Sequence, residues 1–254
     1  MNWRKSILIH VPHSSTFIPD VYRTSFLLSD EELKHEVLLM TDHFVDDLFA
    51  IPGITSHINP ISRLVMDPER FRSDADEPMV KKGMGAVYTR TATGKLMRDL
   101  SQSEHVEILT NLYDPYHAGL AQKTARILAE HNLCLIIDAH SYPSEPLPYE
   151  QHDDGEQPNR PDICLGYEPY HMDDGLLAKA VDYFENRCGL TTAHNEPFAG
   201  SMVPSCYYHR DPRVRSLMIE IKRSLYMDER TAEQNHRYGL IKKRIHNFFT
   251  HVIG

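Results

Sequence analysis

The chain contains 254 residues, of which 41% are hydrophobic and 25% charged, a composition typical of a globular protein. Its length suits a single α/β domain over residues 1–254. The net charge of −9 argues against nucleic acid or an anionic membrane as a partner. No apolar run approaches the roughly 18 residues that a membrane helix needs.

The sequence also indicates a cytoplasmic location. Two positive charges, Arg4 and Lys5, precede a short apolar stretch that His10 and Pro12 soon break, which makes a poor secretory signal. The cysteines form no CxxC pair, so they predict free thiols in a reducing compartment instead of a zinc knuckle. They stand far apart, at Cys134, Cys164, Cys188 and Cys206.

The chain begins with a predicted strand and a long predicted helix. Residues 6–12 form an apolar run typical of a buried strand. The helix is predicted from Asp30 to Ala50, because Ser29–Glu32 has the capping-box pattern at its start. Pro52-Gly53 predicts its end.

The middle of the chain predicts a strand, a surface excursion, a helix and another strand. Residues 61–66 are apolar and predict a strand, whereas 67–94 are polar and rich in Gly, Pro and Asp. A helix is predicted over 103–131, kinked or split at Pro115. Residues 133–138 give the clearest strand pattern.

The last third predicts a loop followed by two strands and two helices. The loop, or lid, covers 143–161, and the strands are 162–167 and 216–222. The helices are 174–188 and the amphipathic segment 230–252. Strands separated by helices predict an α/β fold with a central, mostly parallel or mixed sheet covered by helices on both faces.

Two histidines follow predicted strands: His13 comes after 6–12, and His140 comes after 133–138. Sites in such sheets form at the carboxyl ends of the strands, where these side chains would meet. Glu220 lies inside an apolar strand, where a carboxylate must be paired, protonated or catalytic. Two histidines, one acidic residue as the third ligand and a glutamate base are what a hydrolytic zinc site needs.

Asp42 is the first candidate for the acidic residue. On the predicted helix, it borders the apolar stripe formed by Leu38, Val45 and Phe49, so it needs a partner. Asp46 is the second candidate. Structural interpretations remain open: Asp42 paired with an arginine, His13 in a purely structural role, and Glu220 in a salt bridge to Arg223 or Arg63.

Supporting residues are predicted around these four. Asp138 could accept the other ring N–H of His140, and Ser141 follows that histidine directly. A nucleophilic role for Ser141 is disfavoured, because the sequence lacks a G-x-S-x-G elbow. Arg63 and Arg70 are candidates for binding a carboxylate, with a buried structural ion pair as the alternative.

Taken together, the motifs resemble the N-formylglutamate amidohydrolase family, which is distantly similar to zinc carboxypeptidases and cell-wall amidases. The matching segments occur in family order and span nearly the whole chain. They are 11–15, 41–49, 61–67, 113–117, 138–141, 161–166, 195–200 and 220–227.

The resemblance implies a zinc-carboxypeptidase-like α/β hydrolase fold and a role for each matching residue. His13, Asp42 and His140 would bind Zn²⁺, or another divalent metal, and Glu220 would be the catalytic base. The residues expected to bind substrate are Arg63, Arg70, His117, Arg223 and Asn195. For His117, a structural role on its helix is the open alternative.

The implied activity is hydrolysis of the amide bond of a small, anionic N-acyl acidic amino acid. N-formyl-L-glutamate is the expected substrate, with a role in histidine degradation. Two alternatives stay open. One is hydrolysis of another N-acyl amino acid or a peptide fragment by the same site, and the other is a metal-free protein that binds acidic ligands through its arginines. For a second substrate carboxylate, Arg90 is a further candidate beside Arg70 and Arg223.

Overall fold

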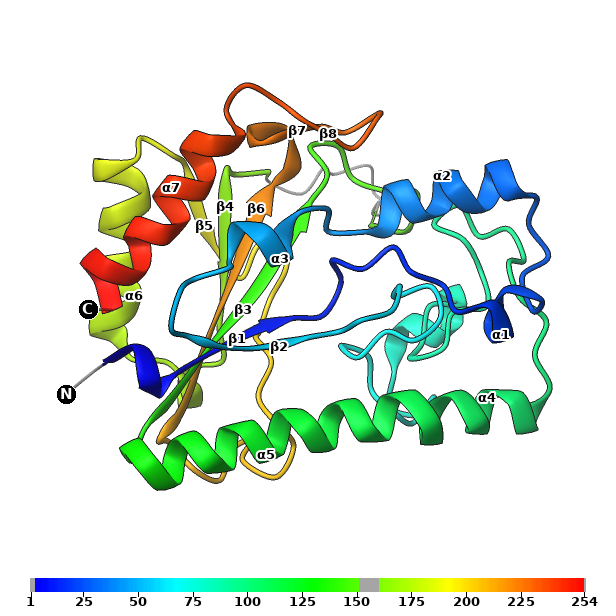
Figure 1. The fold of residues 1–254 in the computed structure, drawn as a ribbon, viewed down its shortest axis with the longest axis horizontal. Coiled ribbons are helices and arrows are strands. Elements are labelled where there is room, and N and C mark those ends of the chain that lie inside the picture. Colours follow the sequence, from blue (N-terminus) through cyan, green and yellow to red (C-terminus); the bar gives the residue numbers. More distant parts are fainter. Residues whose placement is uncertain (1–2, 151–159, 254) are drawn as a thin grey trace.

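A six-stranded sheet forms the centre of the protein in the computed structural model (Figure 1). The structure describes residues 3–150 and 160–253. The strands of this sheet are β1 Ile7–Val11, β2 Thr55–Ile58, β3 Cys134–Tyr142, β4 Ile163–Gly166, β5 Thr192–His194 and β6 Val214–Lys222. Two short strands outside it, β7 Met227–Asp228 and β8 Glu233–Gln234, form an antiparallel pair.

The strand order is β2-β1-β3-β6-β4-β5. The first four run parallel to one another, whereas β4 is antiparallel to β6 and parallel to β5. β1, β3 and β4 are buried along their whole length. That burial explains why their sequences read as near-continuous apolar runs. The prediction of a mostly parallel, mixed sheet is confirmed.

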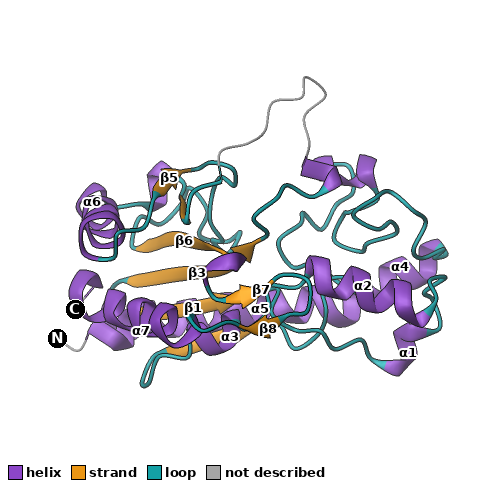
Figure 2. Ribbon diagram, turned by 90° about the horizontal axis from the view of Figure 1, so that it is seen from above, coloured by secondary structure: helices purple, strands orange, loops and turns teal. Residues whose placement is uncertain are grey.

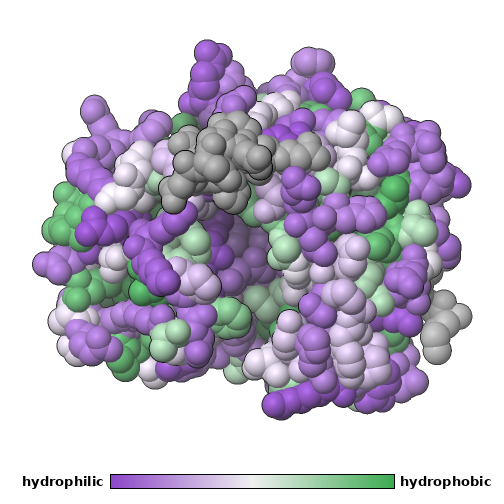
Figure 3. Space-filling view, turned by 180° about the vertical axis from the view of Figure 1, so that it is seen from behind, coloured by the Kyte–Doolittle hydropathy of each residue, from purple (hydrophilic) through white to green (hydrophobic). Residues whose placement is uncertain are grey.

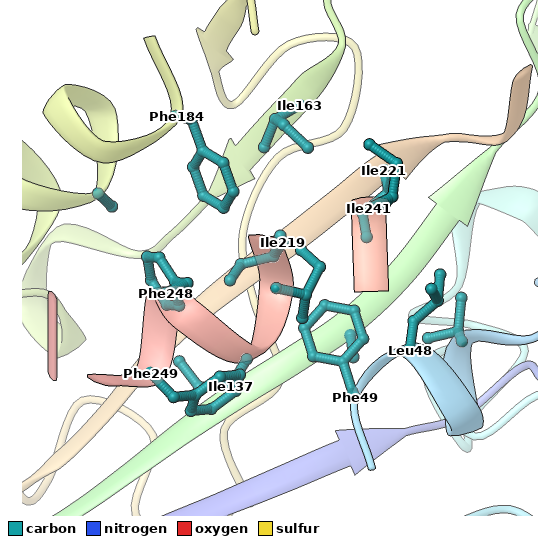
Figure 4. Close-up of a cluster of buried hydrophobic side chains, with 14 of the residues drawn as sticks. Leu48, Phe49, Ile137, Ile163, Phe184, Ile219, Ile221, Ile241, Phe248 and Phe249 are labelled. Carbon is teal, nitrogen blue, oxygen red and sulfur yellow. The ribbon is translucent and has the colours of Figure 1, made fainter. Parts of the chain in front are cut away.

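Helices cover both faces of the sheet, as predicted. On one face lie α3 Val45–Leu48, α6 Asp174–Asp182 and α7 Tyr238–Phe248, and on the other lies α5 Asp114–His131. Figure 4 shows Phe248 and Phe249 against Ile137 and Ile219 of the central strands. Full burial of each such side chain contributes about 1.5–3 kcal/mol.

A second hydrophobic cluster lies to one side of the sheet, where α1 Asp20–Arg23, α2 Asp30–Met40 and α4 Gln102–Ile108 gather (Figure 2). Segment 61–66 belongs to this cluster and forms turns, so the strand predicted there is wrong. Its backbone is satisfied without a strand partner, because Nη1 of the buried Arg98 donates to the carbonyls of Leu64 (3.3 Å) and Val65 (3.1 Å).

The long helix predicted over 30–50 is also wrong in its extent. The capping box at Ser29 is present, but α2 ends at Met40 and Thr41 is extended. Phe44 has a left-handed backbone before α3 begins. Apolar positions continue across the break because α2 packs into the second cluster, whereas α3 packs against the sheet. The helical periodicity of apolar residues over 30–50 therefore reflects burial on both sides of the turn between α2 and α3.

Other boundaries differ by a few residues. The 103–131 helix consists of α4, a π-helical turn Leu109–Tyr113 and α5, and Pro115 comes directly after this π-helical turn, which interrupts the regular α-helical bonding. β3 continues past residue 138 to Tyr142. The C-terminal helix starts at Tyr238, because the β7–β8 pair occupies part of the predicted span. The sequence did not predict β2 and β5.

The surface excursion predicted over 67–94 is wrong in its second half, because Met84, Ala86, Val87, Tyr88 and Ala92 are buried in the second cluster. The remaining predicted strands and helices agree with the structure. The strands at 162–167 and 216–222 are β4 and β6, and the 174–188 helix is α6 followed by a π-helical turn Tyr183–Arg187. Of the predicted loop 143–161, residues 151–159 lie outside the described part. Within residues 3–150 and 160–253, each helix is too short or too polar to cross a membrane.

Candidate active site

A cavity of about 310 Å³ lies where the carboxyl ends of the central strands meet the second cluster. His13 follows β1 by two residues, whereas His140 lies within β3, not beyond its end as predicted. His140 and Glu220 are register partners on the parallel strands β3 and β6. The neighbouring strands therefore bring these three side chains to one cavity. Figure 3 shows a recess with hydrophilic residues at its bottom on the face opposite to that of Figure 1.

Asp42 reaches the same cavity from the break between α2 and α3. Its backbone N–H donates to the carbonyl oxygen of His13 at 3.0 Å, which ties the two segments together. Its Oδ2 lies 3.8 Å from Nδ1 of His13 and 3.3 Å from Nδ1 of His140. Asp46 is exposed on α3 and does not line this cavity. The structure thus brings Asp42, and not Asp46, beside both histidines.

His13 is oriented as a metal-binding histidine would be. Its Nε2 lies 2.8 Å from Oδ1 of Asp67, while its buried Nδ1 has no hydrogen-bond partner among the described residues. Burial, with the nearby charge of Arg63, lowers the pKa of His13 and favours the neutral ring. A neutral imidazole fixed by a carboxylate on one nitrogen keeps a free lone pair on the other. The residues present therefore fit a metal ion.

Asp67 anchors this part of the site, and the sequence did not assign it a role. Its fully buried carboxylate accepts from Nε and Nη2 of Arg63 (3.2 and 2.7 Å) and from the hydroxyl of Tyr88 (2.7 Å). Burial alone would raise its pKa, but Arg63 and His13 hold the pKa of Asp67 well below its usual range. Asp67 is thus an anion that fixes His13.

His140 is supported from behind by a buried chain of hydrogen bonds. Its Nε2 lies 3.1 Å from Oδ1 of Asp138, which in turn lies 2.7 Å from Nδ1 of His10. Nε2 of His10 accepts from the hydroxyl of Tyr116, at 2.7 Å. The chain connects α5 to the cavity through β1 and β3. The sequence placed Asp138 beside His140 but gave no sign of His10 and Tyr116, which meet them only through strand pairing and helix packing.

Glu69 is a further acidic residue at the site that the sequence analysis did not assign. Its Oε2 lies 3.1 Å from Nε2 of His140. Within the described residues, ligand atoms of His13, Glu69 and His140 come close enough together to hold a metal ion, and so do those of His10, Glu69 and Asp138. The feature of the sequence that could have indicated Glu69 is its position between Pro68 and Arg70, shortly after the apolar segment 61–66.

Glu220 is buried, and its Oε2 has no hydrogen-bond partner among the described residues. Burial, together with the negative charges of Asp42 and Glu69, raises the pKa of Glu220 to about 8. No ion pair of Glu220 with Arg223 or Arg63 occurs in the described part of the chain. Its carboxyl group is therefore available to exchange a proton near neutral pH.

Arg223 holds the site together from the side of Asp42. Its Nη2 donates to Oδ1 of Asp42 at 2.9 Å, its Nη1 to the carbonyl of Leu39 at 2.6 Å, and its Nε to Oγ of Ser141 at 3.3 Å. The backbone N–H of Ser141 also donates to Asp42, at 3.2 Å. Arg223 and Ser141 therefore orient Asp42, and the guanidinium has little capacity left for a substrate.

Two other arginines line the cavity with donors to spare. Arg63 spends Nε and Nη2 on Asp67. Arg70 uses only Nε, which donates to the carbonyl of Met84 at 3.3 Å, among the contacts made by described residues. Arg90 is exposed, lies outside this cavity and donates to the carbonyl of Gly94. Arg70 is thus the guanidinium with the most free donors at the cavity.

Residues 5–227 match the model of a family described as N-formylglutamate amidohydrolase. The chain belongs to the N-formylglutamate amidohydrolase family. It is 28% identical to an N-formylglutamate deformylase of Pseudomonas aeruginosa over 89% of this chain and 84% of the relative. It is 24% identical to an N-formylglutamate deformylase of Pseudomonas putida over 89% and 83% of the two chains.

Solved structures support the fold assignment. The crystal structure of an N-formylglutamate amidohydrolase from Ralstonia eutropha JMP134 superposes with a TM-score of 0.82 at 22% identity, covering 98% of this chain and 92% of the other. A gene product of Agrobacterium tumefaciens superposes with a TM-score of 0.64 at 20% identity, covering 96% and 90%. At this identity, the likeness extends to the fold alone.

Two residues predicted to bind substrate lie outside the cavity of this N-formylglutamate amidohydrolase family member. Nε2 of His117 donates to the carbonyl of Pro68 at 2.9 Å, which holds the segment that carries Glu69 and Arg70. Oδ1 of Asn195 accepts from the backbone N–H groups of Tyr167 and Gly200 (2.8 and 3.1 Å). Both side chains shape segments that line the cavity.

Proposed function

We propose that the protein hydrolyses the amide bond of N-formyl-L-glutamate and releases formate and glutamate. Membership of the family and the names of the Pseudomonas relatives support this substrate. The structural observation that carries the proposal concerns two buried atoms that have no hydrogen-bond partner among the described residues, Nδ1 of His13 and Oε2 of Glu220. Both belong to residues that line one cavity with Arg70.

His13, Asp42 and His140 would hold the metal ion, because two imidazole nitrogens and one carboxylate oxygen converge there. Glu69 contacts Nε2 of His140, the ring nitrogen that Asp138 also contacts, so it belongs to a second possible set of ligands with His13 and His140. When bound, zinc supplies Lewis acidity that polarises the amide carbonyl and makes a water molecule easier to deprotonate. Asp67 and Asp138 fix the two histidine rings from the side away from Asp42.

Glu220 is proposed as the group that moves the proton. Its carboxylate takes a proton from the attacking water, whose oxygen forms a bond to the formyl carbon. When the carbon–nitrogen bond breaks, Glu220 returns the proton to the leaving nitrogen. A carboxyl whose pKa is raised to about 8 by burial is suited to both transfers near neutral pH.

Arg70 and Arg63 are proposed to bind the carboxylates of the glutamate portion. A doubly anionic substrate approaches a protein of net charge −9, so local cations must offset the unfavourable overall field. Arg70 offers two nitrogens without partners among the described residues and Arg63 offers one, which favours bidentate recognition by Arg70. Arg223 contributes indirectly by fixing Asp42.

The test is to incubate purified protein of measured metal content with N-formyl-L-glutamate and to quantify formate and glutamate. We expect both products in equal amounts. Glu220→Gln should lower kcat by about 10²-fold or more without loss of metal. His140→Ala should lose the metal, whereas Glu233→Gln on the exposed β8 should behave like the wild type. Metal-loaded wild type that releases no formate would contradict the proposal.

A further inference from the structure

A second cavity, of about 430 Å³, adjoins the candidate active site. Glu69, Ala199 and Met218 line both cavities, so the two meet at these residues. Beyond them, the second cavity runs along the segment 199–205 towards Tyr208 and Phe71. Both aromatic residues are exposed, at 46% and 63%. The candidate active site therefore has an extension that the glutamate portion of the substrate does not account for.

The charge of this extension differs from that of the main cavity. Among its described lining residues there is no Arg or Lys, and the only carboxylates are Glu69 and Asp138, at the end next to His140. A carboxylate placed here would meet like charges without a cation. The anionic end of a substrate therefore favours the side of Arg63 and Arg70, which leaves the extension to the uncharged end on the other side of the amide bond.

The walls of the extension suit an apolar group. They include the side chains of Phe71, Met202, Val203 and Tyr208. A formyl group is comparable in size with one or two water molecules, each of about 30 Å³ in the liquid. The extension is several times larger than that. Apolar walls and surplus volume next to the reacting centre are the features of a pocket for an aliphatic chain.

We propose that this extension is an acyl subsite and that the protein hydrolyses N-acyl-L-glutamates whose acyl group is an uncharged aliphatic chain longer than formyl. The inference rests on the proposed function, because it uses the same ligands, the same base Glu220 and the same arginines. Water adds to the acyl carbon and the carbon–nitrogen bond breaks. The acyl group leaves as a carboxylic acid, and the nitrogen receives the proton as glutamate forms.

The experiment compares kcat/KM for N-formyl-, N-acetyl-, N-butyryl- and N-hexanoyl-L-glutamate with the metal-loaded full chain. From acetyl to hexanoyl, kcat/KM should rise about threefold for each added methylene that the subsite buries. A steady fall with chain length, with N-formyl-L-glutamate still hydrolysed, would overturn the acyl subsite and leave the proposed function standing. Hydrolysis of the longer substrates but not of the formyl compound would support the subsite and revise the substrate of the proposed function. Hydrolysis of none would overturn both.

Two variants test the location of the subsite. Ser205 is exposed and lines the extension but not the main cavity, so Ser205→Trp should fill the subsite. We expect it to lower kcat/KM for the hexanoyl substrate by about tenfold or more while leaving the formyl substrate within about twofold. Phe71→Ala, which removes an apolar wall, should lower only the values for the longer chains.

The matched control is Ser103→Trp, on the exposed side of α4 and away from both cavities. It should leave the whole series unchanged. An equal loss for all four substrates in Ser205→Trp, with metal content and circular dichroism like the wild type, would overturn the assignment of the subsite.

Discussion

Arg223 and Asp42 form a buried ion pair at the edge of the cavity, with Nη2 of Arg223 2.9 Å from Oδ1 of Asp42. Only 6% and 3% of the two side chains are exposed. Burial alone would raise the pKa of Asp42, but hydrogen bonding to His140 and the charge of Arg223 lower it. The second oxygen of Asp42 is the one that lies near His13 and His140. Arg223 thus fixes a carboxylate that two histidines share.

Arg223→Met is expected to weaken metal binding and folding together. Breaking a buried pair by removing one partner costs about 3–5 kcal/mol, because the other charge stays buried. Zinc affinity should fall by about 10–100-fold as Asp42 loses its orientation. Urea unfolding and chelator competition measure the two effects.

The matched control for Arg223→Met is Arg215→Met, which removes a partly exposed pair with Asp173 and should cost no more than about 1 kcal/mol. A raised KM with unchanged zinc affinity in Arg223→Met would instead assign Arg223 to the substrate.

Tyr116→Phe is expected to lower zinc affinity from a distance. The change leaves Nε2 of His10 without its donor, which loosens the chain through Asp138 to His140. Removing the support of a metal-binding histidine typically lowers affinity by about 10-fold or more. Chelator competition measures it directly.

Tyr183→Phe controls for the loss of a tyrosine hydrogen bond elsewhere, because its hydroxyl donates to the carbonyl of Arg244. Both variants should lose about 1–2 kcal/mol of unfolding free energy. Only Tyr116→Phe should bind zinc more weakly, and equal zinc affinities in the two variants would show that the chain does not reach His140.

The sheet could be predicted from the sequence because its central strands are buried on both faces. β1, β3 and β6 contain apolar runs that few other structures would explain. The predictions of secondary structure were wrong where an apolar segment packs without forming a regular helix or strand. Segment 61–66 is buried as turns around Arg98, and the helical periodicity across Asp42 joins two helices that pack into different clusters.

Only those residues of the candidate site whose positions follow from the predicted strands could be predicted from the sequence. His13, His140 and Glu220 stand at strands that lie side by side, so their meeting follows from the sheet. Glu69 and Asp67 arrive on a loop whose path depends on contacts such as that of His117 with Pro68. His10 meets Asp138 because the two are register partners on β1 and β3, a pairing that the sequence does not state.

His57 should make the protein less stable at acidic pH. Its buried ring donates from Nε2 to the carbonyl of Tyr116, and burial, with His10 and Lys123 nearby, lowers its pKa to about 4. The folded state thus favours the neutral ring. The neutral ring of His57 stabilises the folded state fully above about pH 6.5, the pKa of histidine in the unfolded chain. This stabilisation is lost as the pH falls towards 4.

Between pH 7 and pH 5, the wild type should lose about 2 kcal/mol more unfolding free energy than His57→Gln. Urea unfolding at both values checks this difference. His35→Gln, at an exposed position on α2, should keep the full dependence of the wild type. If His57→Gln has the same pH dependence as the wild type, the imidazole of His57 is not responsible.

Arg70→Ala should raise the KM for N-formyl-L-glutamate by about 10–100-fold, because a charge-assisted hydrogen bond contributes about 1.5–3 kcal/mol. Arg70 is held in place for this role by the hydroxyl of Tyr113, which donates to its carbonyl at 2.8 Å. Arg70→Lys should give a KM between those of the wild type and Arg70→Ala, since it keeps the charge but loses the planar fork of donors. Arg90→Ala removes an exposed arginine outside the cavity and should leave KM unchanged.

Initial rates with N-formyl-L-glutamate and N-formyl-L-glutamine then identify the substrate carboxylate that Arg70 binds. If Arg70 pairs with the side-chain carboxylate, Arg70→Ala should reduce the preference for the glutamate compound, whereas an equal loss for both compounds would assign Arg70 to the α-carboxylate. An unchanged KM for both would exclude Arg70 from substrate binding.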